Sequence, residues 1–181
     1  TNRRKMKQLF LLFALLLLFQ QRSFSQCNSG PVTISGNALI TGSCIITGDL
    51  TIPNGATLEV DLTSPAADTF VVRGNILLQG NAVLRIHGAP NATGEQFIVS
   101  NSFNAQRTIT TQDSSKIQLE HIEFRTQEGN LANAASIYMN YDALDNSILY
   151  VDHSSLDPET AWILFNMKNK STLIGYETYK V

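Results

Sequence analysis

Two acid–histidine pairs are the residues of this chain that most resemble a chemical site: Glu120–His121 in SKIQLEHIEF and Asp152–His153 in SILYVDHSSL. The two stretches align without a gap and place His121 opposite His153, an offset of 32 in sequence number. A carboxylate beside an imidazole can orient the ring for acid–base catalysis, and two such pairs brought together can ligate a divalent metal. Repeated residues also arise from repeated structure, so the elements that carry the pairs decide between chemistry and architecture.

Strict alternation of apolar and polar residues indicates that these elements are β-strands. Every second residue is apolar or small from Ala38 to Ile52 and again from Phe70 to Ile86, and the residues between are mainly polar. A period of two is typical of strands with one buried face. Helix signals are nearly absent, so we expect an all-β chain.

The strands also repeat along the chain. Segment 48–60 (GDLTIPNGATLEV) is echoed by 74–86 (GNILLQGNAVLRI), and 95–103 (EQFIVSNSF) resembles 116–124 (KIQLEHIEF) at an offset of 21. Self-similar strands at intervals of about 20 to 30 residues predict a solenoid, because one unit cannot bury its apolar face alone. A β-sandwich, the alternative, would show hairpin turns instead of single Gly or Asn corners. We therefore expect a parallel β-helix over residues 48–181.

The coil pattern resembles a family. Gly-x-Leu-x-Ile followed by Gly-Ala-x-Leu-x-Val at 48–60 is similar to the first coils of secreted, right-handed, single-stranded parallel β-helix proteins of the pectate-lyase type, and the repeat covers most of 36–175. LYVDHSSL also resembles the Trp-Ile-Asp-His coil motif of pectate lyases, which implies Asp152 and His153 as catalytic candidates, with Tyr150 in place of the Trp. The chain departs from those enzymes because no Arg-x-Pro-x-x-Arg-like segment follows.

A structural interpretation of the two histidines competes with the catalytic one. The inward parity changes at His121 and at His153, so we expect both residues at bends. Asn, His and Ser suit bends because their side chains can hydrogen-bond backbone groups that the bend leaves unpaired. With Ser100 as the matching residue of the preceding coil, the three side chains are predicted to form one polar stack. No metal site is predicted, because alternation should point the neighbouring acids to a different side.

Acids and tyrosines are interleaved within residues 138–157, the densest acidic part of the chain. On one exposed face such residues can bind calcium or stack on sugar rings. The alternative is a solvated loop between coils. Calcium is the one cofactor that this group suggests, and its candidate ligand-binding residues are Tyr138, Tyr141, Asp142, Asp145 and Tyr150.

Residues 1–25 are typical of an export signal. Four basic residues precede the eleven apolar residues 9–19, and Ser23 and Ser25 are small residues of the kind that a signal peptidase reads. Eleven residues are too few to span a bilayer stably, although an uncleaved anchor is the alternative. Met6 is the expected start. The signal followed by Gln26–Cys27 is similar to exported proteins of Bacteroidota-type bacteria and implies a secreted or outer-surface protein, with the membrane involved only through this signal.

Charge and cysteine content narrow the partners and the compartment. Without residues 1–25 the chain keeps fifteen acidic and eight basic residues, a net charge of −7. Nucleic acid and anionic membrane surfaces are excluded as expected partners, since both require a basic face. Cys27 and Cys44 are the only cysteines, and we expect them to form a disulfide in an N-terminal cap of residues 26–47, with two free thiols as the alternative.

The sequence contains no complete catalytic set. We therefore expect an exported β-helix that serves as a non-enzymatic scaffold or adhesin, or that contacts a polysaccharide or surface glycan. The alternative is a polysaccharide lyase or glycoside hydrolase of the same fold, with its catalytic coils beyond Val181. Strand-like residues continue to the end of the sequence, so we expect a longer polypeptide with downstream domains.

Overall fold

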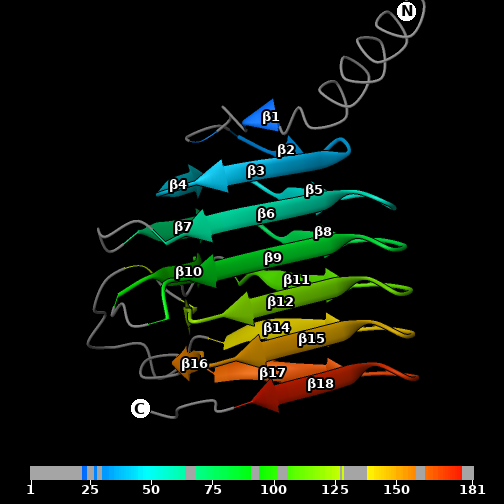
Figure 1. Ribbon diagram of the computed structural model, residues 1–181. Helices are drawn as coiled ribbons and strands as arrows, with labels where there is room; N and C mark the ends of the chain where they lie inside the picture. The colour runs from blue at the N-terminus through cyan, green and yellow to red at the C-terminus, as the bar shows by residue number, and fades with distance from the viewer. Residues whose placement is uncertain are drawn as a thin grey trace, which may run out of the picture.

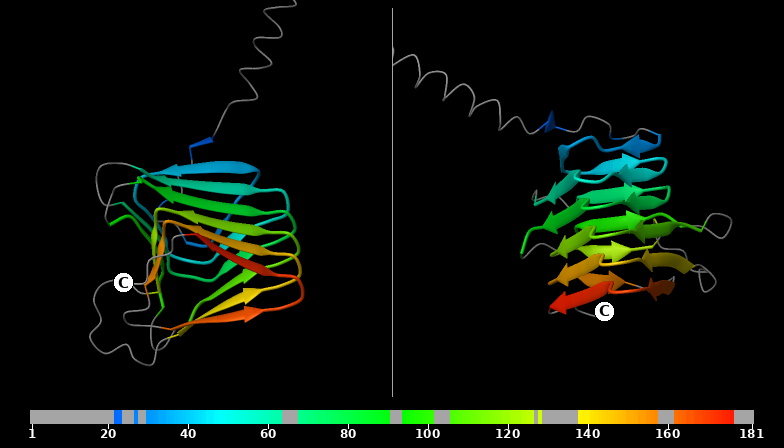
Figure 2. Two further views of the ribbon diagram at one scale, coloured as in Figure 1. Left: turned by 60° about the horizontal axis from the view of Figure 1, so that its bottom comes forward. Right: turned by 90° about the vertical axis from the view of Figure 1, so that its right-hand side faces the viewer.

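The chain winds through three sheets in turn, and its successive coils stack along one axis (Figures 1 and 2). The structure is a computed structural model, and it describes residues 22–23, 27, 30–63, 68–90, 94–101, 106–126, 128, 138–157 and 162–176. All regular structure in these residues is β-strand, and the strands pair in parallel. This architecture agrees with the expected all-β solenoid. The predicted export signal lies outside the described residues apart from 22–23.

Each sheet takes one strand from each coil. Sheet A contains β1 (Arg22–Ser23), β3 (Asn37–Thr41), β6 (Thr57–Leu62), β9 (Val83–Gly88), β12 (Lys116–Glu120), β15 (Ile148–Asp152) and β18 (Thr172–Tyr176). Sheet B contains β4 (Cys44–Ile46), β7 (Thr69–Val72), β10 (Gln96–Val99), β13 (Glu123–Arg125) and β16 (Ser155–Asp157). Sheet C contains β2 (Val32–Thr33), β5 (Leu50–Ile52), β8 (Ile76–Leu78), β11 (Thr108–Thr111), β14 (Tyr138–Ala143) and β17 (Trp162–Met167).

The core is a stack of inward side chains, one layer for each coil. Alternate residues of β6 illustrate the pattern, since Leu58 and Val60 are fully buried while the residues between them are partly exposed. In sheet B the equivalent residues are Phe70, Phe97 and Phe124, whose ring centroids lie 5.6 and 5.0 Å apart. Such aromatic pairs add about 0.5–1.5 kcal/mol each beyond the area that they bury.

The register between coils confirms one of the expected repeats and corrects another. Gln118 pairs with Tyr150 and Glu120 with Asp152, which is the offset of 32. The offset of 21 is wrong, because Phe97 pairs with Phe124, which is an offset of 27. Segment 95–99 leads into sheet B, whereas 116–120 forms a strand of sheet A. Strands of different sheets share the same alternation, so similarity in alternation does not identify the sheet.

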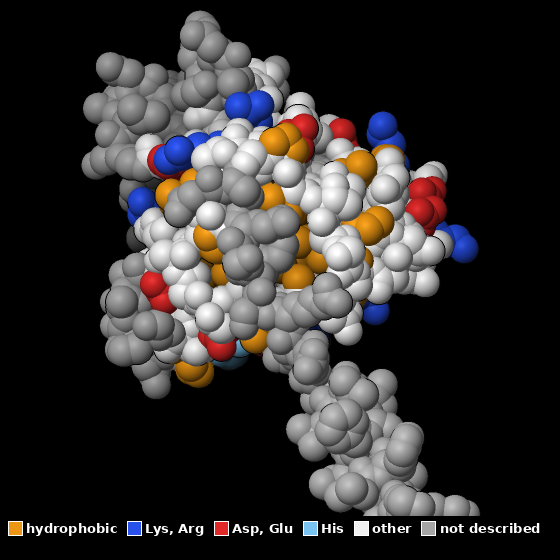
Figure 3. Space-filling view, turned by 90° about the horizontal axis from the view of Figure 1, so that it is seen from above, with side chains coloured by type: hydrophobic (Ala, Val, Ile, Leu, Met, Phe, Trp, Pro, Cys, Tyr) orange, Lys and Arg blue, Asp and Glu red, His pale blue; other side chains and the backbone are white. Residues whose placement is uncertain are grey.

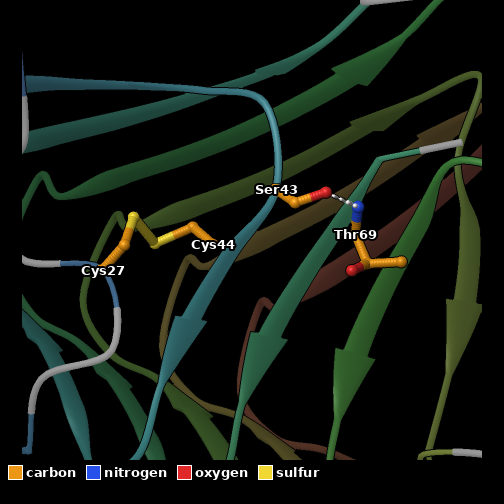
Figure 4. The surroundings of a disulfide bond; sticks show 4 residues. All are labelled: Cys27, Ser43, Cys44 and Thr69. Carbon is orange, nitrogen blue, oxygen red and sulfur yellow. Dashed lines mark hydrogen bonds between the residues drawn. A yellow bond between two sulfur atoms is a disulfide. The ribbon is translucent and has the colours of Figure 1, made fainter. Parts of the chain in front are cut away.

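Regular coils begin at β2, inside the segment 26–47 that we expected to act as a cap. Cys27 and Cys44 form a disulfide with a Cα–Cα distance of 5.0 Å, in agreement with the expected pairing (Figure 4). Cys44 points into the core and Cys27 packs against it. Viewed from the N-terminal end, hydrophobic side chains are visible in the middle of the end face and charged ones lie near its rim (Figure 3). The disulfide therefore fastens the chain beside the first apolar layer, and closing a loop of this size contributes roughly 3 kcal/mol.

The close stacking of coils predicts a strong effect of Gly74→Ala. A Cβ at Gly74 would meet backbone atoms of Gly48 and Asp49 on the preceding coil, and these atoms cannot move without shifting the coil. We expect a loss of about 1–3 kcal/mol in the free energy of unfolding, measured by urea denaturation. Gly30→Ala is the matched control, because an added Cβ there has no atom within 4 Å. Equal stability of the two variants would contradict the described contact between coils.

Candidate functional site

The outer face of sheet A carries columns of mainly polar side chains, with one residue from each coil. The column nearest the turn into sheet B contains Thr41, Asp61, His87, Glu120 and Asp152. The middle column contains Leu39, Glu59, Arg85, Gln118 and Tyr150. Neighbours in a column are separated by the strand spacing of about 4.8 Å, so their side chains can interact from coil to coil.

Polar contacts join these columns across the coils. His87 lies with Nε2 3.4 Å from Oε1 of Glu59 and with Nδ1 4.0 Å from Oδ1 of Asp61. Arg85 donates from Nε to Oε1 of Gln118 at 3.1 Å. The side chains of His87, Glu59 and Asp61 are 24%, 35% and 34% exposed, so each contact contributes little to stability, on the order of 1 kcal/mol or less. These contacts orient the side chains on the face.

The later coils bring the two acid–histidine pairs to the same edge of sheet A. Nδ1 of His153 lies 2.7 Å from Oδ1 of Asp152, and the Tyr150 hydroxyl donates to Oδ2 of Asp152 at 3.3 Å. The rings of His121 and His153 are 5.0 Å apart between centroids. Together with the neighbouring residues of the two columns, these residues form a surface that we call the acid–histidine edge. It contains all three histidines of the chain and consists of Glu59, Asp61, His87, Glu120, His121, Tyr150, Asp152 and His153.

The backbone at His121 and His153 agrees with the structural interpretation. Their φ angles are 54° and 43°, in the left-handed region, and the His121 amide donates to the Asp152 carbonyl at 3.0 Å. Both residues therefore form bends, as expected. The expected stack with Ser100 is wrong, since His121 follows Glu120, which pairs with His87, and its equivalent is therefore Gly88. Ser100 follows β10 in sheet B.

The expected group of acids and tyrosines is not one face. Tyr141 is a core residue, 1% exposed, with its ring centroid 5.5 Å from that of Phe165, and burial raises the pKa of its hydroxyl. Asp142, the next residue along β14, points outward on sheet C and accepts a hydrogen bond from Asn166 at 2.8 Å. Tyr150 lies on sheet A. Tyr138 belongs to β14, and its side chain is outside the described part of the structure.

Asp145 lies at a corner of the solenoid. It lies in the turn from sheet C into sheet A with a φ of 58°, and Asp113 and Asn169 occupy the same turn of adjacent coils with φ of 57° and 59°. Asn169 donates to Oδ1 of Asp145 at 3.0 Å, and Asp113 accepts from the Gly80 amide at 3.0 Å. Asn and Asp tolerate left-handed backbone better than other side chains. These residues therefore stabilise the corner.

Two further observations concern the described residues. Among them, no three His, Cys, Asp or Glu side chains gather as ligands of one metal ion. The same residues include no helix that is long and apolar enough to cross a membrane.

No known protein family, curated protein or solved structure matches this chain.

Sequence reasoning missed Glu59, Arg85, His87 and Gln118. Glu59, Arg85 and His87 come from coils without an acid–histidine pair, whereas Gln118 lies two residues before the first pair. The signal was nevertheless present, because aligning GDLTIPNGATLEV with GNILLQGNAVLRI sets Glu59 opposite Arg85, and the structure has this pairing.

The left-handed bend predicts which substitutions His153 accepts. We expect His153→Asn to change the free energy of unfolding by less than about 0.5 kcal/mol, since Asn tolerates this backbone. His153→Val should cost about 1–2 kcal/mol or more, because a β-branched residue is strained at positive φ. Thr57→Val, at an outward strand position where Val is favoured, is the control for adding apolar surface. Chemical denaturation that finds both His153 variants equally stable would contradict the structural role.

The edge also contains a carboxyl group with a shifted pKa. Thr63 donates to Oδ1 of Asp61 from its hydroxyl at 2.6 Å and from its amide at 2.9 Å, and the hydroxyl hydrogen bond is the main cause that lowers the pKa of Asp61. Because the folded-state pKa is the lower one, this contribution to stability is present above the unfolded-state pKa and is lost as pH falls through the folded-state value.

We therefore expect Thr63→Ala to raise the pKa of Asp61 toward its ordinary value. The free energy of unfolding should then decrease less as the pH falls than it does in the wild type. A carboxyl-carbon NMR titration measures the pKa in both proteins. Thr57→Ala, which alters an outward threonine of the same strand as Asp61, is the control. An Asp61 pKa that is the same in wild type and Thr63→Ala would show that the hydrogen bond is not its cause.

Proposed function

We propose that this protein is an exported, right-handed parallel β-helix of the pectate-lyase type that binds polysaccharide, without cleaving it, along the outer face of sheet A. The observation that supports this function is the pair of mainly polar outward columns, in which neighbouring coils hold one another's side chains through contacts such as those of His87 with Glu59 and of Arg85 with Gln118. The disulfide supports an oxidising compartment, in keeping with export.

The face suits an extended chain of sugars. Successive coils lie about 4.8 Å apart along the solenoid axis, so each coil can present its outward groups to a successive part of a linear ligand. Carboxylates, the Gln118 amide and the Arg85 guanidinium are hydrogen-bond partners for sugar hydroxyls. The half-buried ring of Tyr150 adds an apolar surface for the face of a sugar ring, and its hydroxyl is already held by Asp152.

Charge favours a neutral or amino-sugar polysaccharide over a polyuronate. The acid–histidine edge carries four carboxylates, Glu59, Asp61, Glu120 and Asp152. Among the described side chains of the outer face of sheet A, the Lys and Arg residues are Arg85 and Lys116. A surface with this excess of negative charge repels an anionic chain and attracts a cationic one. Polyuronates, the substrates expected for a lyase of this type, are therefore the less suitable ligands.

A polysaccharide lyase or hydrolase is the second candidate function. The contact of 2.7 Å between Asp152 and His153 favours it, since a carboxylate that orients an imidazole is a recurring feature of general bases. The bend at His153 and the contact of its ring with the ring of His121, 5.0 Å between centroids, explain the same residues without catalysis. We therefore place the enzymatic function second.

Affinity electrophoresis on a panel of soluble polysaccharides tests the proposal. We expect retardation by neutral glucans, xylans or chitosan and none by polygalacturonate. Tyr150→Ala and Arg85→Ala should each weaken binding about tenfold, the effect of losing roughly 1.4 kcal/mol. Asp142→Asn, on the outer face of sheet C, is the control and should bind as wild type does.

The same samples separate the two functions. Retarded protein that leaves the polymer length unchanged supports binding without cleavage. Binding by no polymer, or binding that Tyr150→Ala and Arg85→Ala leave intact, would contradict the proposed face. Polymer shortening that disappears in Asp152→Asn would establish the enzymatic alternative.

A further inference from the structure

A groove of about 380 Å³ lies on sheet C, where it crosses the stacked strands β5, β8 and β11 (Figure 1). Ligand pockets have volumes of about 300–1,000 Å³, so the groove can hold a small molecule. It belongs to a different sheet from the acid–histidine edge. The residues of its lining that point outward from the sheet are Asp49, Thr51, Asn75, Leu77, Thr108 and Thr110.

Two polar side chains of the groove are held in place by backbone amides. Oδ1 of Asp49 accepts from the Asn75 amide at 2.7 Å, and Oδ1 of Asn75 accepts from the Thr108 amide at 3.0 Å. The second contact fixes the orientation of the Asn75 carboxamide, because a backbone amide requires the oxygen and not the NH₂ group as its partner. Asp49 and Asn75 are both exposed. They therefore present a carboxylate oxygen and an NH₂ group from adjacent coils, about 4.8 Å apart in backbone spacing.

The neighbouring column of the groove places an apolar side chain between two hydroxyl groups. Leu77 pairs with Thr51 of the preceding coil and with Thr110 of the following one, and all three side chains are half-buried. Leu77 is the exception in this outward column, whose other described members are Thr33, Thr51, Thr110, Asp142 and Asn166. The groove thus combines a small apolar patch with polar groups around it, as ligand sites do.

The chemistry of the lining selects the class of ligand. Its described residues include one carboxylate and no Lys, Arg or His, so an anionic ligand would find no opposite charge. One carboxylate is too few for a hard metal ion, and the NH₂ group of Asn75 is a donor that disfavours an ammonium group beside it. A neutral sugar fits, because each hydroxyl can both donate and accept while the C–H groups of the ring can contact an apolar side chain.

We propose that this groove binds one unit of a neutral sugar. One sugar hydroxyl donates to the Asp49 carboxylate, a neighbouring hydroxyl accepts from the Asn75 NH₂ group, and the ring packs on Leu77. The threonine hydroxyls supply further hydrogen bonds. The site goes beyond the proposed binding of polysaccharide along sheet A and does not depend on it.

An NMR titration of the ¹⁵N-labelled protein with glucose, galactose, mannose and xylose tests the proposal. With at least one of these sugars, the backbone amide signals of Asn75 and Thr108 should move and saturate, since both amides donate to the side chains that hold the ligand. We expect a Kd of about 1–10 mM, because one sugar unit makes few contacts. The same shifts should remain in Tyr150→Ala, which separates this groove from the proposed face of sheet A.

Conservative variants identify the groups that bind. Asn75→Asp keeps an oxygen for the Thr108 amide and removes the NH₂ group, so it should weaken binding about tenfold or more. Thr110→Val removes a hydroxyl at nearly constant size and should weaken binding about threefold. Asn140→Asp is the matched control, because Asn140 pairs with Thr108 in the same column and does not line the groove. It should bind as wild type does.

Three results would overturn the proposal. The first is that none of the four sugars moves the Asn75 and Thr108 amide signals of the wild type. The second is that Asn75→Asp binds as tightly as the wild type. The third is that the shifts disappear in Tyr150→Ala, which would place the sugar on sheet A instead of in the groove.

Discussion

In the described strands, each inner coil forms its backbone hydrogen bonds with the coils above and below it, and the resulting parallel register determines the rest of the structure. A slip of one residue would turn the apolar side chains outward and the polar ones into the core. Equivalent residues therefore stack, as the rings of Phe70, Phe97 and Phe124 do. The same register aligns the outward residues of sheet A in columns. Core and candidate binding face are two consequences of one constraint.

The coils contain different numbers of residues. The strands nevertheless stay in register, because the additional residues lie in the turns between them. Equivalent residues of sheet C are Ile76, Ile109, Tyr141 and Phe165, whose successive offsets in sequence number are 33, 32 and 24. The turn from sheet C into sheet A is similar in successive coils, with left-handed backbone at Asp113, Asp145 and Asn169. The turn from sheet A into sheet B varies. It contains the bends at His121 and His153 in the later coils and a buried acid, Asp68 or Glu95, in the two coils before them.

The sequence was sufficient to predict the strands, their inward faces and the repeat at an offset of 32, because a period of two and a repeated motif are local signals. It was insufficient to assign strands to sheets. That assignment depends on how many residues each turn contains, and the alternation of 95–99 and 116–120 is alike although they belong to different sheets. The disulfide partners followed from the presence of only two cysteines.

The candidate site was harder to predict for a related reason. Tyr141 and Asp142 are adjacent in sequence and were grouped together, but neighbours on a strand point to opposite sides, one into the core and one to solvent. Glu59 and His87 are far apart in sequence and meet only because their coils stack. A face built across coils can be identified only once the register is known.

The register between coils is therefore the claim to test first, and a distance across the whole stack tests it most directly. Asn37 and Thr172 are exposed, outward residues of one column of sheet A, separated by five steps of strand pairing. Spin labels on Asn37→Cys and Thr172→Cys should give a narrow distribution by double electron–electron resonance. It should centre near the Cα separation of about 24 Å, with a few ångströms added by the labels. A broad distribution, or one centred far from this distance, would contradict the stacked parallel coils.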